Sequence, residues 1–488
     1  MDLVVVALFW AFCLWVIVRR AVLLAFAGAI VMLPFGSMSA VPTAVTGGLT
    51  LLPSPVLALI GIGLFAASPA GRAFVIETAF TPRRLGLVTL YLMIAVFSAI
   101  FYPRIFAGMV EVVPLRGELS GYGGGFSRLA PTPQNLSQLF YFSISVLLIF
   151  CIAFLMQYER YRQILLKAIF ITSVITVVTG ALDYASQFVP LSPLLAPFRT
   201  ATYSLLTEHE VFNAKRVVGL MPEASSFGPM CVGRAIVLFL WRDAFESARI
   251  RRWVPVLVPL LLLFAFLSAS SSAYLEMGVA AVVLGFRAVL ALFRRRPEAR
   301  SGSALPWALA AVGGFSLLLA VYAVVPGAFS HVEALIDRMV LSKGTSSSFQ
   351  ERMAWNTVSL QALADTYGIG VGVGATRASS WPVAVVTNLG IPGALVLVVF
   401  ALQAFLRRKV FYSRSEMVLC RGSAWALPPV VASSALTGTS PDMGILGISL
   451  LLGVQAAFGL ARQAPAMQPA APAAAAPVWA GRANMGRL

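Results

Sequence analysis

The sequence is poor in charged residues, histidine and cysteine. Charged residues occupy 11% of its 488 positions, whereas 59% are hydrophobic and the mean hydropathy is +0.87. A soluble domain of this length needs a larger polar surface, so the composition argues against a soluble protein and predicts a membrane protein.

The scarcity of cysteine and histidine argues against several kinds of site. The four cysteines lie within or at the edge of apolar segments, without a C-x-x-C pair: Cys13, Cys151, Cys231 and Cys420. We expect them to pack as small apolar residues and to form no disulfide. The two histidines, His209 and His331, are isolated, and no His, Asp or Glu cluster has the spacing of metal ligands. We therefore expect no metal and no cofactor.

The formal net charge of +17 does not indicate a nucleic-acid partner, because the basic residues form short clusters between apolar blocks. Such clusters mark the cytoplasmic ends of membrane helices. They fall in alternate connections, which predicts an outside N-terminus and a cytoplasmic C-terminus. The clusters contain Arg19, Arg20, Arg72, Arg83, Arg84, Arg160, Arg162, Lys167, Arg249, Arg251, Arg252, Arg294 to Arg296, Arg407, Arg408 and Lys409.

Apolar runs long enough to cross a bilayer as helices, about 20 residues, repeat along the chain. The first run lacks the basic start and cleavage site of a signal peptide, so we expect it to be retained. We predict an all-α, polytopic transmembrane bundle over residues 1–463 and a disordered, Ala/Pro-rich cytoplasmic tail over 464–488. The thirteen predicted spans are roughly 3–18, 21–38, 51–68, 85–102, 138–156, 166–184, 227–241, 254–270, 273–293, 305–325, 380–405, 420–440 and 443–461.

This topology places three long connections outside, at about 103–137, about 185–226 and about 326–379. Connections of this length are uncommon unless they have a function. The first is rich in glycine, and the other two contain most of the residues that are suited to chemistry.

The second outer connection contains Lys215 and Arg216, then Gly219, and Glu223 at the start of an apolar run. Arg216 lies on the side of the membrane where basic residues are disfavoured, which indicates a function. A guanidinium suits phosphate oxygens, and a desolvated Glu223 would suit a general base at neutral pH. A structural ion pair between Arg216 and Glu223 at a helix end is an equal alternative.

The third outer connection contains Arg352 and Trp355, then alternating glycines over 368–374, then Arg377. Backbone amides in such a string can approach an anion. The string does not form a P-loop, however, and we favour a tight turn that leads into the next span.

The short outer turn 268–272 is rich in serine and precedes Tyr274 and Glu276. Its hydroxyls either form an ordinary turn or face a polar substrate groove. An acidic residue inside an apolar span indicates a function, although pairing of Glu276 with Arg234 would satisfy it equally well.

In this order and spacing, the motifs resemble those of the O-antigen polymerase/ligase superfamily (Wzy/WaaL-like), which includes exopolysaccharide polymerases. Three elements over about 206–395 carry the resemblance, and the hydropathy profile extends it to most of the chain. They are Arg216-x-x-Gly219-x-x-x-Glu223, the turn 268–272, and Ser348…Arg352-x-x-Trp355 followed by the glycine string and Asn388-x-Gly390-x-x-Gly393.

The sequence departs from the ligases of this superfamily at one place. Ligases usually carry a His-Asn-type pair shortly before the helix that follows the glycine string. This chain has Ser379, Ser380, Trp381 and Pro382 there. It is therefore more similar to the exopolysaccharide polymerases.

The resemblance implies a metal-independent, GT-C-like glycosyltransferase of the bacterial inner membrane that polymerises repeat units on its outer face. The implied donor is an undecaprenyl-pyrophosphate-linked oligosaccharide and the implied acceptor a growing polysaccharide, with a chain-length regulator and export machinery as further partners. Arg216 and Arg352 would hold the pyrophosphate, and Glu223, or His209 in second place, would deprotonate the acceptor hydroxyl. The candidate substrate-binding residues are Lys215, Ser271, Tyr274, Trp355 and Arg377.

Three alternatives remain open at this point. One is a ligase-type transferase. Another is a transporter or flippase for lipid-linked oligosaccharides, although transporters commonly show internal repeats and broken helices, and the two halves of this chain show no convincing duplication. A non-catalytic scaffold of a secretion complex would not require Arg216 and Arg352 on the outer side.

Overall fold

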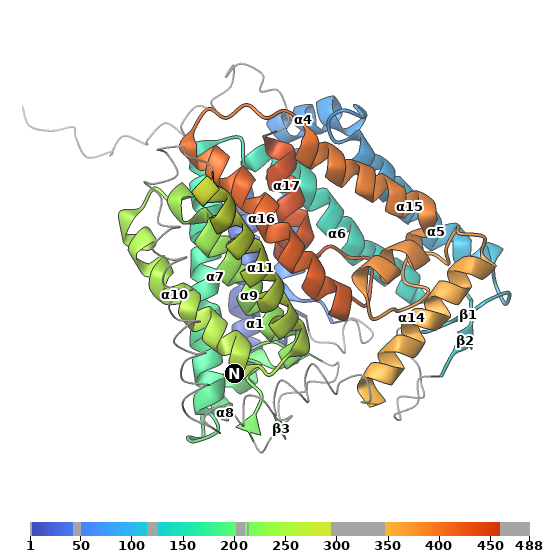
Figure 1. Cartoon of the computed structure of the whole chain (residues 1–488), viewed down its shortest axis with the longest axis horizontal. Coiled ribbons are helices and arrows are strands. Elements are labelled where there is room, and N and C mark those ends of the chain that lie inside the picture. The colour runs from blue at the N-terminus through green and yellow to red at the C-terminus, as the bar shows by residue number, and fades with distance from the viewer. Residues whose placement is uncertain are drawn as a thin grey trace, which may run out of the picture.

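The computed structural model describes residues 2–41, 50–114, 125–201, 210–211, 214–293 and 347–458, and this part of the chain is mostly helical (Figure 1). Its strands form two short antiparallel hairpins, β1 (Glu111–Val112) with β2 (Ser127–Arg128) and β3 (Glu210–Val211) with β4 (Ala214–Lys215). The α-helices are α1 (Asp2–Val18), α2 (Val22–Val31), α3 (Pro53–Ala67), α4 (Pro69–Ala79), α5 (Gly86–Ile105), α6 (Pro133–Leu155), α7 (Glu159–Ala185), α8 (Ser192–Leu195), α9 (Ala224–Trp241), α10 (Ala248–Leu267), α11 (Ser271–Phe293), α14 (Ser347–Asp365), α15 (Trp381–Leu406), α16 (Arg414–Thr437) and α17 (Ser449–Ala457).

Within the described ranges, seven helices are long and apolar enough to cross a membrane: α5, α6, α7, α9, α10, α11 and α15. Helices α3 and α4 pass this test only together and are bent by 88° where they meet. Helices α1 and α2 are apolar but shorter. The prediction of a helical membrane protein is confirmed at this level.

The count of thirteen spans is not confirmed. The predicted span at 305–325 and the predicted tail at 464–488 lie outside the described residues. Helix α2 ends at Val31 rather than at residue 38, because Pro34 disfavours helical backbone just before it. The last predicted span divides into a π-helical turn, Gly444–Ile448, and α17. Hydropathy alone does not reveal such breaks.

The described helices pack around two long ones and bury two large apolar clusters and one smaller one. Helix α9 packs against α7, α10, α11 and α16, and α6 packs against α3, α5 and α17. At the end of α9, Trp241 is fully buried beside Gly422 of α16, where an added Cβ would lie 2.5 Å from the Trp241 ring. Close packing of this kind fixes α9 against α16 at the end of α9 that lies away from Glu223.

One arginine of the predicted cytoplasmic clusters has a structural role. Arg162, at the start of α7, is 2% exposed and forms an ion pair of 3.1 Å with the equally buried Glu416 of α16. Arg162 also pairs with Glu159 and donates a hydrogen bond of 2.8 Å to the carbonyl oxygen of Met156. This side chain therefore fastens α7 to α16 rather than remaining in water.

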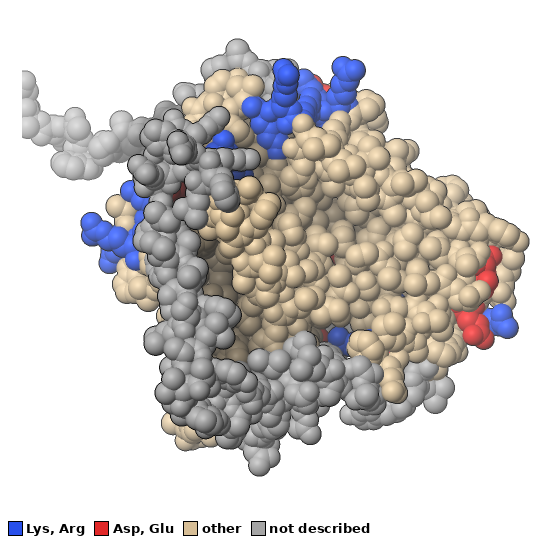
Figure 2. All heavy atoms as spheres, in the orientation of Figure 1, with Lys and Arg blue, Asp and Glu red and all other residues tan. Residues whose placement is uncertain are grey.

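The two ends of the bundle differ in surface charge. Lysine and arginine side chains gather on the surface at the end where α4 lies, whereas α14 and the strands lie toward the other end (Figures 1 and 2). Such an uneven distribution is typical of membrane proteins that obey the positive-inside rule.

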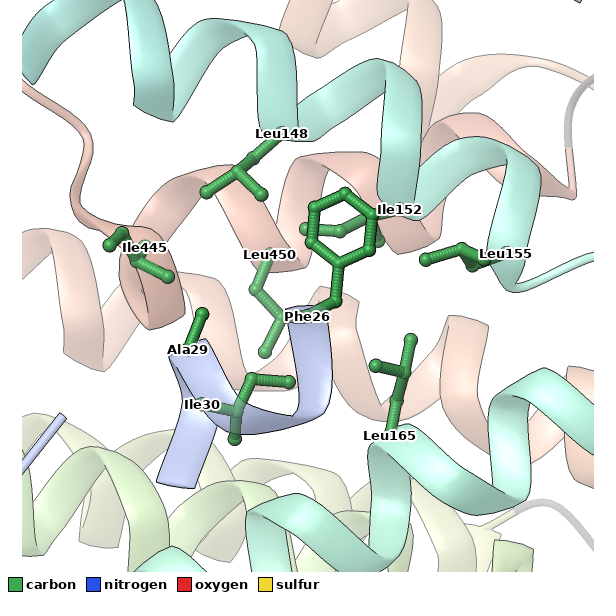
Figure 3. Close-up of a pocket in the computed structure, with 9 residues that line it drawn as sticks. All are labelled: Phe26, Ala29, Ile30, Leu148, Ile152, Leu155, Leu165, Ile445 and Leu450. Atoms are coloured by element: carbon green, nitrogen blue, oxygen red, sulfur yellow. The ribbon is translucent and has the colours of Figure 1, made fainter. Parts of the chain in front are cut away.

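The core contains a small apolar cavity, shown in Figure 3. Its volume is about 20 Å³, room for roughly one water molecule. It offers no polar group for binding or chemistry, so we regard it as space left by packing. Its lining is Phe26, Ala29, Ile30, Leu148, Ile152, Leu155, Leu165, Ile445 and Leu450.

Candidate functional site

The segment that leads into α9 is held by a buried carboxylate. Asp183, near the end of α7, is fully buried and accepts hydrogen bonds from the backbone N–H groups of Val218 (2.7 Å) and Gly219 (3.0 Å). It also forms ion pairs with Arg199 (2.7 Å) and Lys215 (3.5 Å). Gly219 has a φ of +56°, which a residue without a side chain adopts at little cost. The segment therefore has a fixed path.

The side chain of Arg216 is bound to the serine-rich turn. Its Nε and Nη2 donate hydrogen bonds to the carbonyl oxygens of Ser268 (3.0 Å) and Ala269 (2.9 Å). These residues follow the last turn of α10, where carbonyl groups lack partners within the helix. Arg216 forms no ion pair with Glu223 in the described part of the chain, so that structural alternative is not realised.

Glu223 immediately precedes α9 and has an extended backbone, with φ −157° and ψ 160°. Its carboxylate makes no capping hydrogen bond to the helix. Instead it accepts a hydrogen bond from the hydroxyl of Ser225. Glu223 is thus held directly before α9, and its carboxylate does not cap the helix.

The opposite side of the site is formed by α14 and the segment before α15. Glu351, Arg352 and Trp355 lie in the first half of α14, and Arg377 lies between the two helices. The guanidinium of Arg377 lies 3.7 Å from the centroid of the Trp355 ring, a cation–π contact. Arg352 donates a hydrogen bond of 3.4 Å to the carbonyl oxygen of Leu436, at the end of α16.

These two sides line one polar cavity of about 240 Å³. Four of the residues singled out in the sequence, Glu223, Arg352, Trp355 and Arg377, are brought together there. They come from segments more than a hundred residues apart. The full lining is Glu223, Ser225, Glu351, Arg352, Trp355, Arg377, Ser379, Thr437 and Thr439.

The cations of the site act on one another. Burial lowers the pKa of the Arg377 guanidinium, an effect that Glu351 and Glu223 oppose and Arg352 increases. Burial likewise lowers the pKa of Arg216, with Glu223 opposing the change and Arg352 adding to it. Partly desolvated cations that repel each other are stabilised by a bound anion, so the arrangement favours an anionic ligand.

The glycine string is a packing element. Gly368, Gly370, Gly372 and Gly374 all have positive φ angles, between 79° and 97°. A Cβ on Gly372 would lie 2.5 Å from the carbonyl oxygen of Ser98 in α5. The string pairs with the start of α15, since the N–H groups of Val371 and Gly372 donate to the carbonyl oxygens of Thr387 (2.9 Å) and Asn388 (3.0 Å). Amides bound in this way are not available to an anion, which agrees with a tight turn.

The other predicted binding residues do not line the cavity. Lys215 lies beside Asp183, Ser271 begins α11, and the hydroxyl of Tyr274 donates a hydrogen bond of 3.0 Å to the carbonyl oxygen of Phe266. His209, the second candidate base, lies outside the described residues.

The intramembrane carboxylate Glu276 is not paired with Arg234. Glu276 is 1% exposed and Arg234 is 6% exposed, yet no ion pair joins them in the described ranges. Oε2 of Glu276 and Nε and Nη1 of Arg234 have no hydrogen-bond partner there. The predicted pairing alternative is therefore wrong.

The residues missed by sequence reasoning are Glu351, Asp183 and Arg199. Glu351 directly precedes Arg352, and a second carboxylate beside a candidate arginine was a usable signal. Asp183 and Arg199 carried no such signal, because their contacts join segments that are distant in sequence. In the part of the chain that the structure describes, no group of three or more His, Cys, Asp or Glu side chains is arranged to hold a metal ion.

Comparison with protein-family models, with curated proteins and with solved structures finds no match.

Proposed function

We propose that this protein is a membrane glycosyltransferase of the O-antigen polymerase/ligase type, and that it polymerises polysaccharide repeat units. The observation that carries the proposal is the common cavity of Glu223, Arg352 and Arg377 at the end of an apolar helix bundle. It combines a carboxylate suited to accept a proton with cations suited to a pyrophosphate, as the motif resemblance implies.

In the proposed reaction, Arg352 and Arg377 bind the pyrophosphate of a polyprenyl-linked oligosaccharide. A hydroxyl of the acceptor glycan attacks the anomeric carbon, and the bond from that carbon to the pyrophosphate oxygen breaks. Glu223 takes the hydroxyl proton, and the polyprenyl pyrophosphate leaves with the bonding electrons. The two arginines offset the negative charge that develops on the leaving group. Arg216 is fixed to the serine-rich turn, and its positive charge contributes to the electrostatic potential that the pyrophosphate meets.

The proposed orientation places the cavity on the outer face of a bacterial inner membrane, with the N-terminus outside and the C-terminus in the cytoplasm. The basic end of the bundle would then face the cytoplasm, in agreement with the positive-inside rule. A lipid-linked donor carries its pyrophosphate at the membrane surface, which is where a cavity at the end of the bundle would meet it.

Polymerisation is preferred to ligation because of the residues before α15. Ser379 lines the cavity at the place where a ligase would carry a His-Asn-type pair, and its N–H donates to Oδ1 of Asn356 (2.8 Å). The indole of Trp381 donates to the carbonyl oxygen of Pro441 (3.3 Å). The segment thus offers no imidazole to the cavity.

The test is a gel of lipid-linked and polymeric glycan from cells that lack the gene. The cells are complemented with the wild type, Glu223→Gln or Arg352→Ala at matched expression, and Arg249→Ala serves as a control because it removes an exposed cation far from the cavity. We expect the two site variants to accumulate single lipid-linked repeat units and to lose long chains. Normal chain lengths in both variants would contradict the proposal and favour a transporter or scaffold.

A further inference from the structure

Helix α4 lies across the basic end of the bundle, away from the candidate site (Figure 1). Ser68 produces the bend of 88° between α3 and α4, since its backbone is extended and its hydroxyl accepts a hydrogen bond of 3.0 Å from the N–H of Gly71. Helix α3 packs against α6, which is long and apolar enough to cross a membrane, so a helix at this angle to α3 would run along the membrane surface. Arg72, Ile76 and Phe80 follow at every fourth position and are exposed, Ile76 by 72% and Phe80 by 80%.

Two arginine pairs meet beside α4. Arg83 and Arg84 follow α4, and Arg407 and Arg408 follow α15. The two turns are fastened together, because the Arg407 guanidinium donates a hydrogen bond to the carbonyl oxygen of Arg83, and Gln403 donates one of 2.8 Å to that of Pro82.

The charge of this cluster is only partly balanced. Glu77 forms an ion pair with Arg84, and within the described ranges no carboxylate pairs with the other three arginines. Burial, followed by repulsion from Arg84 and Arg83, lowers the pKa of the Arg407 guanidinium. Ordinary charge placement explains why basic residues occur at this end, but not why they are held against one another. An anion between them would relieve the repulsion.

We propose that this surface, the basic elbow, binds an anionic phospholipid. The basic elbow consists of Ile76, Phe80, Arg83, Arg84, Arg407 and Arg408. The arginines would hold the phosphate of the headgroup, and the exposed side chains of Ile76 and Phe80 would contact the acyl chains. The combination of cations with adjacent exposed apolar side chains matches a lipid better than a free phosphate, which has no apolar part. The inference holds whether or not the protein is a glycosyltransferase.

The test is native mass spectrometry of the purified full chain in detergent, titrated with phosphatidylglycerol or with phosphatidylethanolamine of the same acyl chains. The test variant is Arg83→Gln/Arg408→Gln, which removes two exposed cations and leaves the hydrogen bond between the turns. The matched control is Arg249→Gln/Arg252→Gln, which removes two exposed cations from the first turns of α10. Inorganic phosphate, added as a competitor, separates a lipid site from a phosphate site.

We expect phosphatidylglycerol to bind the wild type and the control more tightly than phosphatidylethanolamine. The elbow variant should bind it about 25-fold more weakly, at about fivefold for each of the two cations removed near the membrane surface. Equal weakening in the control would show that only net charge matters and would overturn the proposal. Displacement by inorganic phosphate, or equal binding of both lipids by the wild type, would overturn it as well.

Discussion

The two sides of the candidate cavity are built differently. On the α9 side, the segment 215–223 is fixed by Asp183, and Arg216 is bound to backbone carbonyl groups. On the α14 side, Glu351 is exposed, and the only hydrogen bond of the Arg352 side chain among the described residues is a long one, 3.4 Å.

The difference indicates that the two sides have different roles. The α9 side supplies a rigid frame that sets the position of Glu223, because most of its polar groups already have protein partners. The α14 side presents cations whose hydrogen-bonding capacity is largely unused, which is what a binding surface for a charged substrate requires. Variants on the α9 side should therefore lose folding, whereas variants on the α14 side should lose turnover.

The largest expected effect is that of Asp183→Ala. The substitution leaves two buried backbone N–H groups without their acceptor and the Arg199 guanidinium without its carboxylate, with the carbonyl oxygen of Gly219 as its remaining acceptor among the described residues. Loss of one partner of a buried ion pair typically costs about 3–5 kcal/mol. We expect a clear fall in the unfolding temperature of the purified protein and loss of activity with it. Wild-type thermal stability of this variant would contradict the frame role.

Substitution of Arg352 by Gln should have the next largest effect, on turnover alone. Removing one group that stabilises developing charge typically slows an enzyme by about 10²–10³-fold. The side chain makes few protein contacts, so we expect an unchanged unfolding temperature. The measurement is glycan transfer by the reconstituted protein together with a thermal unfolding curve. If the unfolding temperature fell together with the activity, Arg352 would also belong to the frame, and the difference between the α9 side and the α14 side would disappear.

The sequence could indicate residues on both sides of the cavity, but not the buried carboxylate that holds the α9 side. Arg352, Trp355 and Arg377 stand out as charged or aromatic residues in an outer connection, and the cavity brings them together with Glu223. Asp183 resembles any polar residue near the end of a span, because its partners come from a loop some thirty residues later. Contacts across such a distance depend on packing, which no local pattern encodes.

The same limit applies to the fold. Helical character and membrane class follow from hydropathy, and the structure bears them out. The bend between α3 and α4 and the early end of α2 depend on single residues, Ser68 and Pro34, inside runs of otherwise uniform apolar composition.

A smaller effect is expected for Trp355, whose ring is in contact with the Arg377 guanidinium. Trp355→Ala should lower transfer activity by about tenfold, the size of a partly desolvated cation–π contact. Trp355→Phe retains a ring and should recover most of that loss. If Phe and Ala are equally impaired, the indole must contact the substrate in another way.

The smallest effect is expected for Lys215→Met. The sequence placed Lys215 among the substrate-binding residues, but its ammonium group lies 3.5 Å from Asp183, which retains Arg199 as its closer partner. We expect a smaller loss of stability than that of Asp183→Ala, because the buried carboxylate keeps a cationic partner, and near wild-type transfer activity. A strong loss of activity with intact stability would return Lys215 to the binding site and extend the cavity toward α7.

The central claim is that the cavity between α9 and α14 binds a pyrophosphate. The direct measurement is binding of a short-chain polyprenyl pyrophosphate, and of the matching monophosphate, to the purified wild type and to Arg352→Gln/Arg377→Gln. We expect the wild type to prefer the pyrophosphate, and the double variant to lose this preference while remaining folded. Equal affinity of the wild type and the double variant for the pyrophosphate would contradict the claim.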